Sequence, residues 1–134
     1  MAAQIATQRG PWPKHYREFW EKQALTTNPS IPLVVRIFSL AYGRHDANGH
    51  TPFGAGDLRR TLIKSAPTAE RPASLFSYRA INKAIKQAVD FGYLDAGSSQ
   101  RCLIVPRGQI QYLQGDAFDP CLTCDRKFER SAAA

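Results

Sequence analysis

The sequence predicts a mainly helical domain that carries one small β-hairpin. Residues 33–42 are apolar almost throughout, and apolar residues recur at helical spacing over 74–91, which predicts two helices that contribute to a core. Directly after the second helix, two stretches of β-forming residues flank a turn that contains Gly97, which predicts the hairpin. The chain has 134 residues, of which 43% are hydrophobic, so it is long enough for one domain with its own core.

We expect the chain to consist of three parts. Residues 1–29 are expected to form an N-terminal extension with one helix, and residues 30–106 the main domain. Residues 107–134 are expected to form a C-terminal extension that is partly flexible. Within the first part, the sequence predicts a helix over residues 14–25 that begins after Pro13, since proline suits the first turn of a helix. The aromatic residues of that helix fall at helical spacing and predict a face packed on the main domain: Tyr16, Phe19 and Trp20.

The main domain is expected to begin with a central helix over residues 33–42. Ser30 is its predicted N-cap, and Gly43 is its predicted end. Its residues are apolar around most of the circumference, as in a helix surrounded by the core. A polar loop is expected over residues 44–54.

Two further helices are expected after that loop. A short one starts near Gly56 and Asp57 and runs to Lys64, and a loop over residues 65–73 follows it. The clearest helix covers 74–91 and ends at Gly92, where a glycine is expected after the last helical turn. Its predicted buried side contains Ser77, Ile81, Ala84, Ile85 and Ala88, and its predicted exposed side contains Arg79, Asn82, Lys83, Lys86 and Asp90. The hairpin strands are expected at Tyr93–Asp95 and Arg101–Val105.

The positive charge of the chain is concentrated in the middle. The net charge is +7, and residues 56–107 alone contain nine Lys or Arg against four Asp or Glu. Residues 108–134 contain three Lys or Arg against four Asp or Glu. A basic surface attracts phosphate groups and releases their counterions, so nucleic acid is the partner that the charge favours. The alternative is a basic surface that serves only solubility.

The segment Ile81–Val105 resembles the end of a winged helix-turn-helix domain. There a long recognition helix ends at a Gly-Tyr/Trp-Leu/Ile pattern and turns into the wing, as K-A-I-K-Q-A-V-D-F-G-Y-L does at residues 83–94. With the two upstream helices, the resemblance covers about Ile31 to Pro106. The loop before the recognition helix is longer than the tight turn of a minimal helix-turn-helix.

This resemblance implies a sequence-specific protein that binds double-stranded DNA, a regulator of transcription of prokaryotic or phage origin without enzymatic activity. Winged-helix repressors often form homodimers through terminal extensions, so the aromatic N-terminal helix and residues 107–113 are the expected dimer contacts. The alternative function is a winged helix used for protein–protein contact with host transcription or replication machinery.

The predicted DNA contacts lie on the two last helices and the hairpin. A major groove about 12 Å wide admits one α-helix, and Arg and Asn side chains can read base edges in it. We assign base contact to Arg79, Asn82 and Lys83, assisted by Ser77 and Tyr78, and phosphate contact to Lys86 and Gln87. Backbone contact is assigned to Arg59, Arg60 and Lys64 on the short helix, and wing contact to Ser98, Ser99, Gln100 and Arg101. The alternative for the charged helix face is an ordinary solvated surface.

The three cysteines suggest no disulfide framework, but two of them form a C-x-x-C motif, Cys121 and Cys124. A structural zinc site needs four ligands, and His45, His50 or Cys102 could complete this half-site. A single C-x-x-C motif supplies only two of the four ligands. Free thiols in a loose tail are therefore the favoured interpretation, and a bound zinc ion is the alternative.

The sequence contains no pattern that predicts an enzyme. We find no phosphate-binding loop, dinucleotide fingerprint, paired carboxylates or nucleophile in a recognisable setting. We also expect no small-molecule ligand. No apolar run approaches the roughly 18 residues of a membrane span, and no secretory signal is recognised at the N-terminus, so we expect a cytoplasmic, nucleoid-associated protein.

Overall fold

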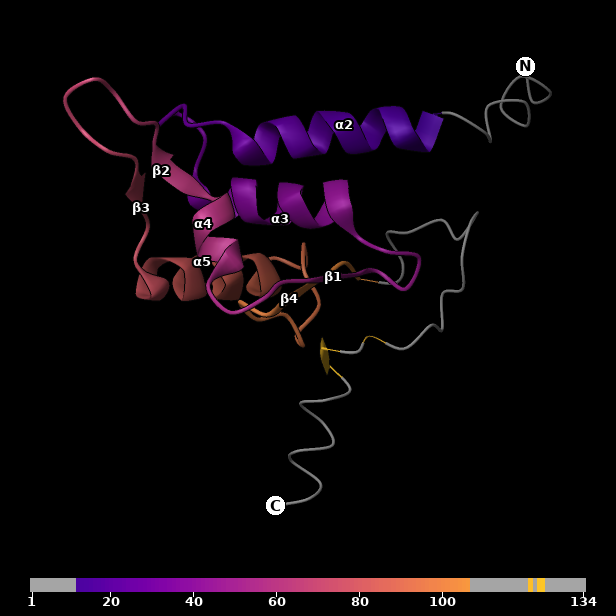
Figure 1. The fold of residues 1–134 in the computed structure, drawn as a ribbon. Helices are drawn as coiled ribbons and strands as arrows, with labels where there is room; N and C mark the ends of the chain where they lie inside the picture. Colours follow the sequence, from indigo (N-terminus) through magenta and orange to yellow (C-terminus); the bar gives the residue numbers. More distant parts are fainter. Residues whose placement is uncertain (1–11, 107–120, 122, 125–134) are drawn as a thin grey trace.

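Helices dominate the structure, and two small antiparallel sheets accompany them (Figure 1). The computed structural model describes residues 12–106, 121 and 123–124. The helices of this part are α2 (Trp12–Leu25), α3 (Leu33–Arg44), α4 (Asp57–Thr61) and α5 (Tyr78–Asp90). The strands are β1 (His50–Pro52), β2 (Ile63–Ser65), β3 (Ser74–Leu75) and β4 (Cys102–Ile104). The predicted mainly helical fold with a small β element is confirmed at this level. None of the described helices has the length and apolar character that crossing a membrane requires.

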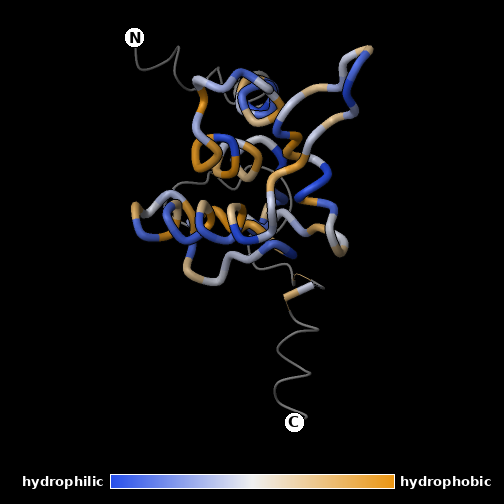
Figure 2. Tube along the Cα trace, turned by 90° about the vertical axis from the view of Figure 1, so that its left-hand side faces the viewer, coloured by the Kyte–Doolittle hydropathy of each residue, from blue (hydrophilic) through white to orange (hydrophobic). Residues whose placement is uncertain are grey.

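The core lies between α3 and α5, which are stacked one below the other in Figure 1. Ile37 and Leu40 of α3 and Ile81 of α5 are completely buried, and Leu103 of β4 joins them. Figure 2 shows the hydrophobic side of α5 turned toward α3 and its hydrophilic side turned away. This burial removes apolar surface from water at about 25 cal/mol per Å2, which is the main term that stabilises the arrangement.

Helix α2 covers the opposite side of α3, as the N-terminal aromatic residues predicted. Trp20 packs against Phe38 and Tyr42, with ring centroids 6.4 Å and 5.6 Å away. Gln23 donates a hydrogen bond of 2.8 Å to Ser39, and Arg44 forms an ion pair of 2.8 Å with Glu21. Phe19 remains 57% exposed, and the side chain of Tyr16 lies outside the described residues.

Two predicted boundaries of α3 are wrong. Ser30 does not cap the helix: its backbone N–H donates to Asn28 Oδ1 in a preceding turn, and Pro32 occupies the N-cap position. Gly43 does not end the helix, which continues to Arg44. Gly43 is buried inside the helix instead, at the place where α2 passes closest.

The predicted hairpin partner of β4 is also wrong, because β4 pairs with β1. The register joins His50 to Ile104 and Thr51 to Leu103, so part of the predicted polar loop 44–54 is a strand. Residues 93–95 form no strand because Tyr93 and Leu94 donate to Ala88 O, at 2.9 Å and 3.3 Å, and so complete the end of α5. Asp95 is nevertheless bonded to β4, since its N–H donates to Ile104 O at 2.8 Å.

A hairpin that was not predicted, β2–β3, lies between α4 and α5. Ile63 pairs with Leu75 and Ser65 with Ser74, so α4 ends at Thr61, before Lys64, and α5 begins at Tyr78, after Ser74. Gly92 does follow α5 as predicted, with a positive φ of 81°. The segment 107–113, an expected dimer contact, lies outside the described residues.

Gly43 supplies the first testable prediction. A Cβ at this position would lie 2.8 Å from Glu21 N and 3.1 Å from Arg17 O, both of them backbone atoms of α2. In an open helix, Gly→Ala stabilises by roughly 0.5–1 kcal/mol. We expect Gly43→Ala to do the opposite and to lower the free energy of unfolding by about 1–3 kcal/mol, because α2 and α3 must move apart. Urea denaturation measures the change.

Gly92→Ala is the control for this experiment, since a Cβ there meets nothing within 4 Å. Its cost comes from the positive φ alone, and Gly92→Asn should recover part of it because asparagine tolerates that conformation. A stabilised Gly43→Ala variant would show that the two helices are not in close contact.

Candidate nucleic-acid interface and candidate metal centre

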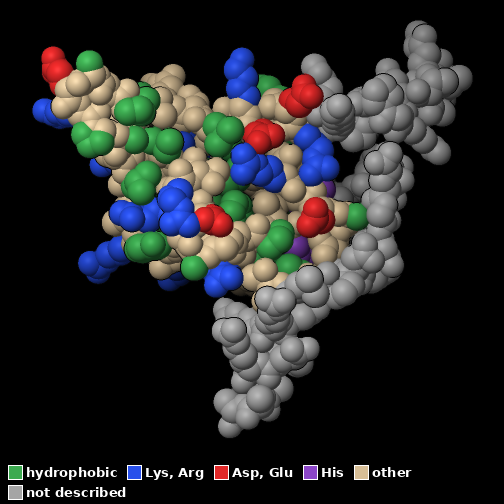
Figure 3. All heavy atoms as spheres, in the orientation of Figure 1, with side chains coloured by type: hydrophobic (Ala, Val, Ile, Leu, Met, Phe, Trp, Pro, Cys, Tyr) green, Lys and Arg blue, Asp and Glu red, His purple; other side chains and the backbone are tan. Residues whose placement is uncertain are grey.

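Helix α5 exposes the side that the sequence assigned to DNA. Arg79, Asn82, Lys83 and Lys86 are all exposed, at positions i, i+3, i+4 and i+7 of the helix. The other side, with Ile81, Ala84, Ile85 and Ala88, is buried in the core. Figure 3 shows Lys and Arg side chains gathered along the lower left of the molecule, over α4 and α5. The predicted division of this helix into a core side and a basic side is therefore present among the described residues.

The N-terminus of α5 is held by a side-chain cap. Ser77 Oγ accepts a hydrogen bond of 3.1 Å from Ala80 N, which satisfies one of the free N–H groups of the first turn. Ser77 was predicted on the buried side of the helix, but it is exposed and precedes the helix. Gln87, near the other end, is also exposed. Tyr78 follows Ser77 and is 51% exposed.

The three cations predicted on the short helix differ in their surroundings. Arg59 is half-buried: its Nε donates to Phe76 O at 2.6 Å, and its guanidinium lies 4.8 Å from the centroid of the Tyr78 ring. Arg60 is paired with Asp57 and also donates to Ala55 O at 3.0 Å. Lys64 is exposed on β2. Arg59 therefore ties α4 to the segment that leads into α5.

The turn before β4 lies against α5. Ser98, Ser99 and Gln100 are half-buried, and Ser99 and Cys102 close the turn through N–H···O bonds of 2.8 Å and 3.2 Å. Gln100 Nε2 donates to Tyr78 O at 3.1 Å and to Asn82 Oδ1 at 2.8 Å. Arg101 is exposed, and its Nε donates to Phe53 O at 2.9 Å. Among the predicted wing residues, Gln100 is therefore in contact with the predicted recognition helix.

Arg36 has a structural role that the sequence analysis missed. It is only 3% exposed, and it donates to Ala24 O and to Ile63 O, both at 2.9 Å. Burial lowers the pKa of this guanidinium below its ordinary value. Arg36 joins the end of α2 to β2 across α3. An arginine inside an apolar helix was the available signal, since a charge at such a position needs internal partners.

Four potential metal ligands lie together beside β1 and β4: His50, Cys102, Cys121 and Cys124. Their ligand atoms all lie within 4.8 Å of one another. His50 Nδ1 is 3.4 Å from Cys102 Sγ and 3.4 Å from Cys124 Sγ, and the sulfurs of Cys102 and Cys121 are 3.9 Å apart. The three cysteines are free of disulfides. This group could hold a metal ion.

Pairing of β1 with β4 positions two of these ligands. In the register, Pro52 lies opposite Cys102. His50 is two residues before Pro52 on β1, so His50 and Cys102 are diagonal neighbours on adjacent strands. Cys121 and Cys124 come from the later part of the chain. Burial raises the pKa of the Cys102 thiol, and the neighbouring sulfurs of Cys121 and Cys124 raise it further. Without a cation beside it, the Cys102 thiol resists ionisation.

The sequence analysis named all four of these residues. It did not decide which of His45, His50 and Cys102 complete the C-x-x-C half-site. The structure brings both His50 and Cys102 to the C-x-x-C motif and leaves His45 outside the group. His45 Nδ1 lies 2.8 Å from Asp46 O, and burial lowers its pKa. The strand that begins at His50 was not predicted, because residues 44–54 have the composition of a polar loop. The sequence therefore did not indicate that His50 lies beside Cys102.

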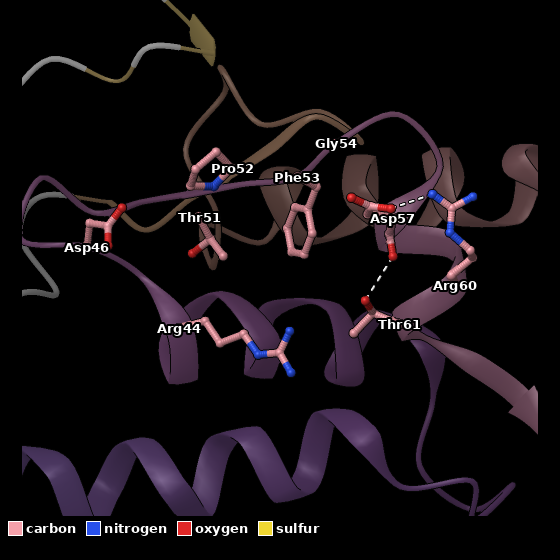
Figure 4. Close-up of a pocket in the computed structure, with 9 residues that line it drawn as sticks. All are labelled: Arg44, Asp46, Thr51, Pro52, Phe53, Gly54, Asp57, Arg60 and Thr61. Atoms are coloured by element: carbon pink, nitrogen blue, oxygen red, sulfur yellow. Dashed lines mark hydrogen bonds and ion pairs between the residues drawn. The ribbon is translucent and has the colours of Figure 1, made fainter.

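A shallow pocket of about 600 Å3 lies between the end of α3, β1 and α4 (Figure 4). Three of its four charged side chains are engaged within the protein: Arg60 with Asp57, and Arg44 with Glu21. Thr61 Oγ1 donates to Asp57 O at 2.8 Å. We therefore place the candidate sites on α5 and at the four-residue metal group.

No family model, no curated protein and no solved structure matches the chain. What the two candidate sites can do must therefore be argued from their own geometry and chemistry.

The proximity of Cys102 and Cys121 can be tested by cross-linking. In a Cys124→Ser variant these two cysteines are the remaining ones, and their sulfurs are 3.9 Å apart. We expect mild oxidation of the chelator-treated variant to form an intramolecular disulfide between them, seen by peptide mass mapping. Cys102→Ser/Cys124→Ser, with one cysteine, is the control. Disulfides formed only between two molecules would contradict the arrangement.

Proposed function

We propose that this protein binds double-stranded DNA through α5 and acts as a sequence-specific regulator of transcription of prokaryotic or phage type. The observation that carries the proposal is the exposed row of Arg79, Asn82, Lys83 and Lys86 on a helix whose other side is in the core. Such a helix can enter a major groove without any rearrangement of the core. Arg and Lys there attract the phosphates, and Arg and Asn can also contact base edges.

The order of elements supports a winged helix-turn-helix interpretation. Helices α3, α4 and α5 are followed by a turn and by β4, and β4 pairs with a strand that lies between α3 and α4. The turn packs on the N-terminal half of α5 through Gln100, so the wing and recognition helix would present one surface to DNA. A hairpin, β2–β3, is inserted between α4 and α5, where a minimal helix-turn-helix has a tight turn.

We further propose that the four-residue group holds one structural Zn2+. Tetrahedral zinc with Zn–S of about 2.3 Å and Zn–N of about 2.0–2.1 Å places two sulfurs about 3.8 Å apart and a sulfur and a nitrogen about 3.6 Å apart. The corresponding distances here are 3.9 Å for the sulfurs of Cys102 and Cys121, and 3.4 Å from His50 Nδ1 to each of two sulfurs. Three thiols and one imidazole are a donor set typical of structural zinc.

The zinc ion would be structural because four protein ligands leave no open position for water or substrate. His50, Cys102, Cys121 and Cys124 would hold it, and it would supply a cation that favours the thiolate form of the cysteines. The ion would join β1 and β4 to the chain around residues 121–124. Its place beside β4 connects it to the turn that contacts α5.

The DNA-binding proposal predicts a charge-dependent and position-dependent loss of affinity. We expect Lys83→Ala to weaken binding to a selected duplex by at least about fivefold, and Arg79→Ala to relax the base preference as well. Affinity should fall steeply as salt rises, since each phosphate contact releases a counterion. Fluorescence anisotropy at several salt concentrations, with duplexes selected from a randomised pool, measures both effects.

Lys22→Ala is the matched control, since it removes the same charge from an exposed position on α2. It should leave the affinity within about twofold. Equal losses in the two lysine variants would indicate attraction by net charge only. If the protein binds no duplex yet captures one complex of host transcription or replication proteins, the alternative function, a protein–protein contact, replaces this proposal.

The zinc proposal predicts about one zinc per chain in protein purified without a histidine tag. Single substitutions Cys102→Ser, Cys121→Ser and Cys124→Ser should each reduce the bound metal, and chelation should lower Tm by about 4–8 °C for each kcal/mol lost. His45→Ala is the control, because His45 lies outside the ligand group. Elemental analysis and thermal unfolding measure these changes, and equal zinc content in all the variants would refute the ligand assignment.

A further inference from the structure

Asn82 lies on the exposed side of α5, and its carboxamide is held from one side by the turn before β4. Gln100 Nε2 donates to Asn82 Oδ1 at 2.8 Å and to the backbone oxygen of Tyr78 at 3.1 Å. An asparagine side chain has two opposite orientations, with either its oxygen or its NH2 group toward a given partner. A donor from Gln100 selects the orientation in which Oδ1 faces the turn.

The backbone that presents Gln100 is fixed on both sides. Ser99 and Cys102 bond to each other through N–H and C=O groups, and Arg101 N donates to Ser99 Oγ at 3.2 Å. Arg101 Nε bonds Phe53 O at 2.9 Å, which ties the same turn to the end of β1. Gln100 is half-buried as a result, and its amide has two acceptors on α5. The turn is therefore a fixed support for the amide.

We infer that Gln100 is a positioning residue for DNA recognition, which orients Asn82 so that its NH2 group faces the DNA and favours guanine at the base that it contacts. This inference rests on the proposed DNA binding through α5. With Oδ1 bonded to Gln100, Nδ2 is the group left to meet a base, and it carries two donors. In the major groove guanine offers two acceptors, N7 and O6, whereas adenine offers one acceptor, N7, beside an amino donor.

The physical consequence is a base preference that depends on a residue that does not itself touch the base. An unsupported asparagine can bond adenine bidentately, with Oδ1 accepting from N6 and Nδ2 donating to N7. The bond from Gln100 holds Oδ1 toward the turn and so turns the two NH2 donors outward. Reversal of the Gln100 hydrogen bond should therefore change which base is preferred.

Gln100→Glu reverses the bond to Asn82 at almost constant size, and it removes the bond to Tyr78 O. A carboxylate accepts hydrogen bonds and cannot donate them, so it would draw the NH2 group of Asn82 toward the turn and leave Oδ1 facing the DNA. Oδ1 accepts from adenine N6 or cytosine N4. We expect the preference at one position of the selected duplex to move from guanine to adenine or cytosine, by about tenfold or more in relative affinity.

Gln87→Glu is the matched control. Gln87 is exposed on the same helix, and the substitution adds the same charge without touching Asn82. Both variants should lose affinity for all duplexes because of the added negative charge, but Gln87→Glu should keep guanine at the Asn82 position. Asn82→Ala should lose the preference there, which identifies the position. Selection from a randomised duplex pool, followed by sequencing, gives the preferences.

A measurement on the free protein tests the contact itself. In two-dimensional 15N spectra recorded without DNA, Gln100→Ala should shift the side-chain amide signals of Asn82, and Gln87→Ala should not. Unchanged signals, a wild-type preference for adenine, or equal preferences in Gln100→Glu and Gln87→Glu would each overturn the inference while DNA binding stands. If the wild-type protein binds no duplex at all, the proposed function fails and takes this inference with it.

Discussion

The pairing of β1 with β4 is the constraint on which both candidate sites depend. It joins residues about fifty positions apart through three facing pairs. On one side it brings His50 next to Cys102, which completes the ligand group of the C-x-x-C motif. On the other side it leads directly into the turn that places Gln100 on α5. A short ladder of three residues per strand thus connects the candidate metal group to the turn that lies against the basic side of α5.

Burial separates the cations of the described residues into two groups. Arg36 and Arg59 are held by backbone oxygens, at Ala24, Ile63 and Phe76, and they join elements of the fold. Other cations are exposed to solvent on α5, on β2 and in the turn before β4: Arg79, Lys83, Lys86, Lys64 and Arg101. Net charge alone therefore overstates the surface available to a polyanion, since a buried guanidinium such as that of Arg36 cannot contact a phosphate group directly.

Local patterns in the sequence were sufficient for the helices and insufficient for strand pairing. The 3.6-residue period identified α3 and α5, and Gly92 identified the end of α5, because both signals are local. The partner of β4 could not be predicted, because Tyr93 and Leu94 have the β-forming character of a strand while their N–H groups bond to Ala88 O. Competition between a helix cap and a strand is decided by three-dimensional hydrogen bonding, which composition does not express.

The candidate sites show the same difference between local signals, which the sequence expresses, and long-range contacts, which it does not. The exposed side of α5 was predictable from periodicity, and its residues are where the spacing placed them. The metal group was half predictable: the C-x-x-C spacing is a local signal, whereas the choice among His45, His50 and Cys102 required the β1–β4 register. The contacts of Gln100 were not predictable, since they depend on the packing of the turn against α5.

The separation of the ligands along the chain has a consequence for the order in which the molecule forms. His50 stands 52 residues from Cys102 and 74 residues from Cys124, so no short peptide contains the complete group. During synthesis, β1 and β4 are made before Cys121 and Cys124, so the pairing that brings His50 next to Cys102 can form before the other two ligands are available. The sulfurs of Cys102 and Cys121 then meet across 19 residues of chain, and the entropic cost of closing a loop grows only slowly with its length.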